Sequence, residues 1–94
     1  MEELVKDSIE ELPVEVHDRL GGITSLETAV SVQFRITDEA GVEEIPWTTC
    51  GIDGMRVLPI VNTTNLDYAI YKLYIRIDVP PETPILGPFE FAVV

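Results

Sequence analysis

The chain of 94 residues has room for one hydrophobic core, so any function must fit on a single small domain. Hydrophobic residues make up 46% of the chain and charged residues 24%, a balance typical of a folded domain and not of a disordered segment. Seventeen acidic residues against six basic ones give a net charge of −11, which argues against binding to nucleic acids or to anionic membranes. Solubility or binding to a basic protein partner is the better explanation of this charge.

The first segment, residues 1–12, is acidic and carries four aliphatic residues at spacings that would share one face of a short helix. Twelve residues are marginal for an isolated helix in water, so we expect a frayed terminus or an arm that becomes ordered on a partner. Pro13 ends the segment. This acidic segment lacks the positive charge of a secretion signal. No stretch of the chain approaches the roughly 20 apolar residues of a membrane-spanning helix. The four aliphatic residues are Leu4, Val5, Ile9 and Leu12.

After Pro13 the hydrophobic period changes to two, which is typical of half-buried strands separated by turns. The pair Asp53-Gly54 is a strong hairpin signal, and Pro46 is tolerated because it opens its strand. The predicted strands are residues 14–16, 30–37, 45–52, 55–61, 71–79 and 89–93, with Gly21-Gly22 and residues 24–28 in the first connection. We therefore predict an acidic arm over residues 1–12 and one all-β domain, an antiparallel sandwich of six to seven strands, over residues 13–94.

The start of the fifth predicted strand carries a pattern found in immunoglobulin-type (Ig-like) domains. Asp67, a small residue and Tyr71 occupy alternate positions, and Leu73 stands where that family has a cysteine. Phe34 stands at the position of the partner cysteine, and Trp47 follows at about the distance of the family's core tryptophan. The resemblance implies an Ig-like sandwich with these five residues as its defining core, in which the Tyr71 hydroxyl bonds back to the corner backbone. The alternative is that Tyr71 and Trp47 are ordinary strand and core aromatics.

The order of elements extends this resemblance over residues 14–94. A TSLETA connection, a VSVQFRITDEAG strand, an Asp-Gly hairpin, an LDYAIYKLYIRI strand and a closing GPFEFAVV strand together resemble the short Ig-like domains of tailed-phage virion proteins. That group includes baseplate upper-protein N-terminal domains and small proteins encoded among head and tail genes. The resemblance implies a structural protein, made in the host cytoplasm and carried in the virion. It would bind other virion proteins in many symmetric copies, for example as a capsid decoration or connector protein.

Groups that could support catalysis are few, and we predict that the protein is not an enzyme and has no cofactor and no metal. His17 and Cys50 each occur once and could form a nucleophilic pair, but Cys50 lies inside a predicted strand, where an inert, half-buried thiol is expected. An alternative function is a calcium- or carbohydrate-dependent adhesion module that uses the turn carboxylates Asp18, Asp38 and Asp53. The chain lacks the D-x-D-x-D-G spacing of a calcium loop.

The predicted strand over residues 55–61 is apolar on both faces and contains Pro59, which cannot donate to a central ladder. We expect a neighbouring chain or the N-terminal arm to cover its second face, unless the strand lies at an edge. Tyrosine and aliphatic residues are the other candidate contacts, although they could instead cover the ends of the protein's own core. The candidate interface residues are Leu4, Val5, Ile9, Leu12, Leu58, Ile60, Tyr68, Tyr74, Ile85 and Leu86.

Overall fold

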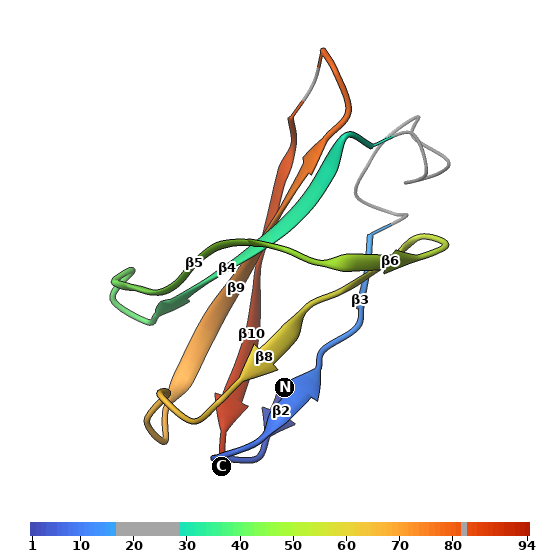
Figure 1. Ribbon diagram of the computed structural model, residues 1–94. Helices are drawn as coiled ribbons and strands as arrows, with labels where there is room; N and C mark the ends of the chain where they lie inside the picture. Colours follow the sequence, from blue (N-terminus) through green and yellow to red (C-terminus); the bar gives the residue numbers. More distant parts are fainter. Residues whose placement is uncertain (17–28, 82) are drawn as a thin grey trace.

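The computed structural model describes residues 1–16, 29–81 and 83–94, and these residues form β-strands without any helix (Figure 1). The prediction of an all-β protein is confirmed. His17, Asp18 and the predicted connection over residues 21–28 lie outside the described residues. The strands are β1 (Glu2–Leu4), β2 (Ile9–Glu11), β3 (Val14–Glu15), β4 (Ser31–Asp38), β5 (Glu43–Thr49), β6 (Gly51–Asp53), β7 (Arg56–Leu58), β8 (Ile60–Asn62), β9 (Ile70–Asp78) and β10 (Ile85–Val93).

The first layer is a five-stranded sheet in the order β1-β10-β9-β4-β5. Neighbouring strands in this sheet are antiparallel except β1 and β10, which are parallel. β1 pairs only with Phe91–Val93 of β10. β9 and β4 are paired from Ser31 opposite Asp78 to Asp38 opposite Tyr71. Along both strands alternate side chains are buried, as the period of two predicted.

The second layer consists of β3-β7-β6 and the pair β2-β8, and it lies in front of the first layer in Figure 1. The chain passes from the first layer to the second at Cys50, between β5 and β6. The predicted hairpin is present, but its turn lies one residue later than expected: Asp53 is opposite Arg56, so Gly54, at φ 62°, and Met55 form the two-residue connection. The predicted strand over residues 45–52 is divided into β5 and β6 at Cys50, and the predicted strand over residues 55–61 is divided into β7 and β8 at Pro59.

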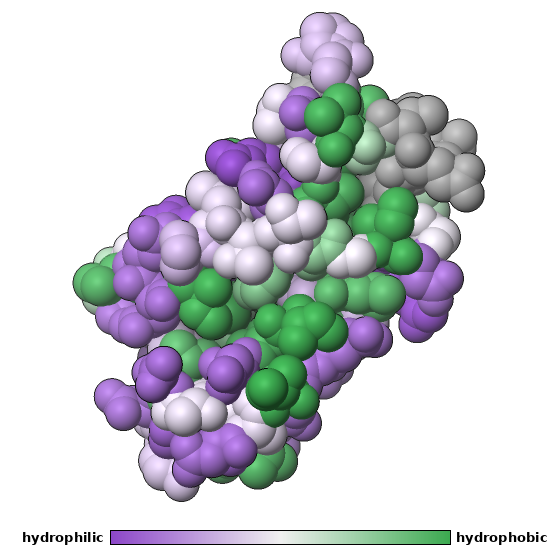
Figure 2. Space-filling view, in the orientation of Figure 1, coloured by the Kyte–Doolittle hydropathy of each residue, from purple (hydrophilic) through white to green (hydrophobic). Residues whose placement is uncertain are grey.

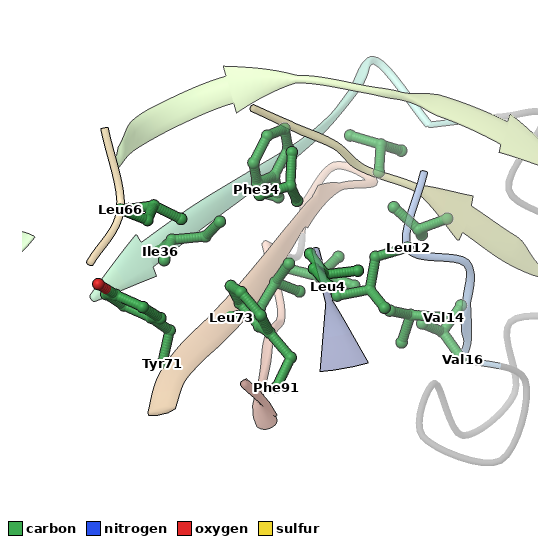
Figure 3. Close-up of a cluster of buried hydrophobic side chains, with 14 of the residues drawn as sticks. Leu4, Leu12, Val14, Val16, Phe34, Ile36, Leu66, Tyr71, Leu73 and Phe91 are labelled. Atoms are coloured by element: carbon green, nitrogen blue, oxygen red, sulfur yellow. The ribbon is translucent and has the colours of Figure 1, made fainter. Parts of the chain in front are cut away.

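The core lies between the two layers, whose inner faces meet as in a β-sandwich (Figure 3). Strands β4, β9 and β10 supply branched and aromatic side chains from one side. The segment before and after β3, together with β7 and β8, supplies smaller aliphatic side chains from the other. The buried hydrophobic residues are Leu4, Leu12, Val14, Val16, Val32, Phe34, Ile36, Val57, Val61, Leu66, Tyr71, Leu73, Ile75, Ile77, Phe91 and Val93.

The predicted N-terminal arm is wrong, because residues 1–12 belong to both layers of the fold. β1 extends the five-stranded sheet and β2 pairs with β8, while Leu4 and Leu12 are only 4% and 5% exposed. Asp7, at φ 60°, lies in the turn between β1 and β2. Two three-residue strands interrupted by such a turn are too short to show a period of two, so their aliphatic spacing resembled that of a helix. Residues 9–12 pair along the edge of the strand containing Pro59, and the Leu12 amide donates to the Pro59 carbonyl over 2.9 Å. They do not cover the outer face of that strand, where Ile60 is 52% exposed.

Two predictions drawn from the Ig-like pattern have different outcomes. The Tyr71 hydroxyl donates to the backbone carbonyl of Asp67 over 2.9 Å, which is the predicted corner bond. Asp67 itself is exposed and contributes its backbone. In Ig-like domains the two cysteine positions, here Phe34 and Leu73, lie in opposite sheets. In this structure both residues are buried, but they come from neighbouring strands of one sheet, where Ile36 is opposite Leu73.

Trp47 was predicted to be the core tryptophan of an Ig-like domain, and this prediction is wrong because Trp47 does not lie in the core. Thr48 is opposite the inward-facing Phe34, so the adjacent Trp47 projects from the outer face of the five-stranded sheet. There the Arg76 guanidinium carbon lies 4.4 Å from the centre of the Trp47 ring, and Arg76 also donates to the Gln33 side-chain oxygen. A cation–π contact at the surface takes the place of the predicted core packing.

Candidate protein-binding surfaces

Three aliphatic side chains form an apolar patch on the outside of the second layer, which we call the outer aliphatic face: Ile9, Leu58 and Ile60. Ile9 and Ile60 are 69% and 52% exposed, and Leu58 is half-buried. Ile9 is opposite Asn62 and Ile60 is opposite Glu11, so the two isoleucines are diagonal neighbours on one face of the β2-β8 pair. Figure 2 shows hydrophobic residues gathered over β8. The sequence predicted all three as contacts, and the structure brings them together.

The other predicted contact residues are distributed over several places. Tyr68, 72% exposed, lies in the corner before β9, and Val5, 58% exposed, lies in the turn after β1. Ile85, also 58% exposed, is opposite Arg76 on the outer face of the five-stranded sheet. Tyr74 and Leu86 are half-buried on β9 and β10. The two predicted contacts Leu4 and Leu12 are wrong, because both are core residues.

The edge strand β5 is poorly suited to pairing with another chain. Its ladder with β4 is interrupted twice by register shifts, between Phe34 and Ile36 and again between Ile36 and Thr37. Pro46 removes one backbone donor from the strand. Bulges and proline are common devices that prevent edge-to-edge association, so the faces of this molecule are better contact surfaces than this edge.

A groove of about 300 Å³ opens between the two layers where β1 begins. β1 reaches only Phe91, so the segment of β10 just before it forms one wall, and the segment around β3 forms the other. Its lining contains both apolar and acidic residues. The lining residues are Glu2, Leu12, Pro13, Val14, Glu15, Phe89 and Glu90.

A buried threonine that sequence reasoning did not single out holds the β1-β2 turn in place. Thr63 is fully buried, and its hydroxyl accepts the Ser8 amide at 3.0 Å and donates to the Val5 carbonyl at 2.6 Å. The Lys6 ammonium donates to the carbonyl of Thr64 over 2.8 Å. These bonds fix β2 against β8 and thereby fix the outer aliphatic face. No local sequence pattern indicates this role, since Thr63 follows β8 within an ordinary polar turn.

Three of the groups considered for catalysis or metal binding, Cys50, Asp38 and Asp53, lie in the described part of the chain and have structural partners. Cys50 is half-buried beside the Val32 carbonyl, 3.7 Å from its sulfur, and burial raises the pKa of the thiol to about 11, so little of it is the reactive thiolate at neutral pH. The Asp38 carboxylate accepts the Val42 amide at 2.9 Å, and the Asp53 carboxylate is paired with Arg56. Within residues 1–16, 29–81 and 83–94, no three histidine, cysteine or acidic side chains gather as a metal site would require.

Comparison of the chain with protein-family models, with curated proteins and with solved structures finds no match. In the part of the chain that the structure describes, no helix has the length and apolar character needed to cross a membrane.

Proposed function

We propose that this chain is a non-enzymatic structural protein that binds other proteins of a tailed-phage particle at its head, neck or tail. The observation that carries the proposal is the outer aliphatic face. Ile9 and Ile60 stay more than half exposed on hydrogen-bonded strands, although sixteen other hydrophobic residues in the described part of the chain are buried. Adjacent exposed aliphatic side chains on a rigid surface are a common mark of a protein contact.

Charge defines the kind of partner. The net charge of −11 makes two copies repel each other at close range, whereas a partner with basic residues around an apolar patch would be attracted. Glu11 is opposite Ile60 and borders the patch, so acidic side chains lie where the rim of such a contact would be. We therefore expect copies of this protein to be spaced over a larger partner, each attached by its outer aliphatic face.

The order of strands and connections supports the assignment to a virion, because it resembles that of small domains found in tailed-phage structural proteins. The test is quantitative mass spectrometry of purified tailed particles made by the source of this gene. We expect the protein at a fixed copy number relative to a major capsid or tail protein, and its absence from the particles would contradict the proposal.

A further inference from the structure

The outer face of the five-stranded sheet carries most of the basic side chains that the structure describes. Of the five lysine and arginine residues in residues 1–16, 29–81 and 83–94, three lie on this face: Arg35 on β4, and Lys72 and Arg76 on β9. Each alternates with buried neighbours along its strand, so its side chain points away from the core. In a protein with a net charge of −11, the cations are therefore gathered on one side.

Two of these three cations face a carboxylate of the same sheet. The Arg35 Nε atom lies 3.0 Å from a carboxylate oxygen of Glu43, and Lys72 is opposite Glu90 on β10. Arg76 differs from both, because no acidic side chain in the described part of the chain forms an ion pair with it. It is the cation on this face with the greatest capacity to bind an anion from outside.

Neutral neighbours hold the Arg76 guanidinium in one orientation. Its carbon lies 4.4 Å from the centre of the Trp47 ring, and its Nε and Nη2 atoms both donate to the side-chain oxygen of Gln33. These bonds use two of the five N–H groups of an arginine, so three have no partner among the described residues. A carboxylate accepts two parallel N–H bonds from a guanidinium, and a side chain already fixed in place loses less freedom when it binds.

We propose that Arg76 binds a carboxylate side chain presented by an acidic segment of a partner protein. Ile85, which is opposite Arg76 and 58% exposed, and the half-buried Trp47 supply apolar contacts around the cation. Arginine and tryptophan are enriched among the residues that contribute most to protein interfaces. This surface lies on the opposite layer from the outer aliphatic face. The outer aliphatic face is bordered by an acidic side chain, so the two surfaces favour partner segments of opposite charge.

Other occupants fit this surface less well. A nucleic acid would bring a continuous phosphate backbone toward a protein with a net charge of −11, which would repel it, whereas a carboxylate brings a single charge. A neutral sugar would leave the remaining guanidinium N–H groups without a charged acceptor. It would also have to share the Trp47 ring with Arg76, which already stacks on it.

Trp47 is the only tryptophan of the chain, so its fluorescence reports directly on this surface. The test is a titration at about 0.15 M salt, where the Debye length is about 8 Å, with the peptide acetyl-Ala-Glu-Leu-Glu-Ala-amide. We expect a saturable change in Trp47 emission, with ¹H–¹⁵N NMR shift changes concentrated at Gln33, Trp47, Arg76 and Ile85. The peptide acetyl-Ala-Gln-Leu-Gln-Ala-amide keeps the shape and loses the charge, so it should bind about threefold or more weakly.

The variant Arg76→Gln should weaken binding of the glutamate peptide, followed by NMR, by about three- to fivefold, as expected for the loss of a partly exposed ion pair. The matched control is Lys72→Gln, which removes the same charge from the same face four residues away, roughly 13 Å along β9. It should change binding by less than about twofold, because that distance exceeds the Debye length.

Three results would overturn the proposal. The first is the absence of saturable binding, or equal binding of the two peptides. The second is equal weakening by Arg76→Gln and Lys72→Gln. The third is the appearance of the same shift changes when the protein is concentrated without peptide, which would assign this surface to a second copy of the chain. All three results leave the outer aliphatic face, and with it the proposed assembly role, to be tested on its own.

Discussion

Tyr71 fixes a corner of the fold through its hydroxyl group, which donates to the Asp67 carbonyl, while its ring stacks on Phe91 at 5.7 Å between centroids. Tyr71→Phe keeps the ring and removes only this bond, so we expect a loss of about 0.5–1.5 kcal/mol in the free energy of unfolding. Urea denaturation measures it. Tyr74→Phe is the control, because it removes a hydroxyl from the half-exposed outer face. Equal losses in the two variants would show that the corner bond has no special role.

The same residue predicts a pH dependence. Burial, followed by the nearby Asp67 carboxylate, raises the pKa of Tyr71 above its ordinary value of 10. A raised pKa in the folded state means that the neutral form stabilises the fold below about pH 10, and that this stabilisation is lost as the pH rises through the folded-state pKa. Wild-type protein should therefore lose its advantage over Tyr71→Phe above pH 10. An advantage that stays constant up to pH 11 would contradict this.

Among the elements, β10 depends on a glycine at its bulge, where the register with β9 shifts between Leu86 and Phe89. Gly87 has φ 121°, and a Cβ atom placed there would lie 2.7 Å from the Leu73 carbonyl oxygen. Gly87→Ala should therefore cost about 1–3 kcal/mol of stability. Gly51→Ala is the control: its Cβ would meet nothing within 4 Å, so we expect little change. Thermal unfolding of the two variants compares them, and similar melting temperatures would show that the bulge tolerates a side chain.

The two N-terminal strands were the least predictable elements, and their contribution can be measured. Leu4 is buried where it pairs with Val93, eighty-nine residues further along the chain, and no local pattern indicates such a contact. Leu4→Ala should destabilise the protein by about 2–5 kcal/mol, whereas Val5→Ala, at a position 58% exposed, should change its stability by less than about 0.5 kcal/mol. Denaturant unfolding distinguishes a core strand from a loose arm. Equal, small effects would mean that the segment is an arm after all.

At the scale of the whole molecule, the sequence predicted which side of a strand is buried better than it predicted which strands are paired. Alternation identified the buried sides of β4 and β9 because a half-buried strand shows its period locally. It could not show that these strands are paired to each other, so Phe34 and Leu73 were matched to a cysteine pair that joins two sheets in Ig-like domains. Trp47 was misplaced for the same reason, since its orientation depends on a bulged register with β4.

The candidate contacts followed the same rule. Leu58 and Ile60 were candidates because their predicted strand is apolar on both faces, whereas Ile9 was chosen as part of an expected arm that the structure does not show. The groove and the buried Thr63 were missed, because each is formed by segments far apart in the sequence. Sequence patterns therefore indicated some of the exposed apolar residues, whereas the pairing of strands was needed to show which of these residues lie together on the surface.

Competitive incorporation into particles tests the central claim most directly. Equal amounts of wild-type protein and of the double variant Ile9→Thr/Ile60→Thr are supplied during particle assembly, and mass spectrometry measures their ratio in purified particles. Threonine keeps the β-branched shape and removes the apolar contact. The control is Val30→Thr/Val42→Thr, at positions 70% and 58% exposed outside the outer aliphatic face. We predict at least tenfold depletion of the first variant and equal incorporation of the second. Equal incorporation of both, with both folded, would contradict the claim that this protein is attached by its outer aliphatic face.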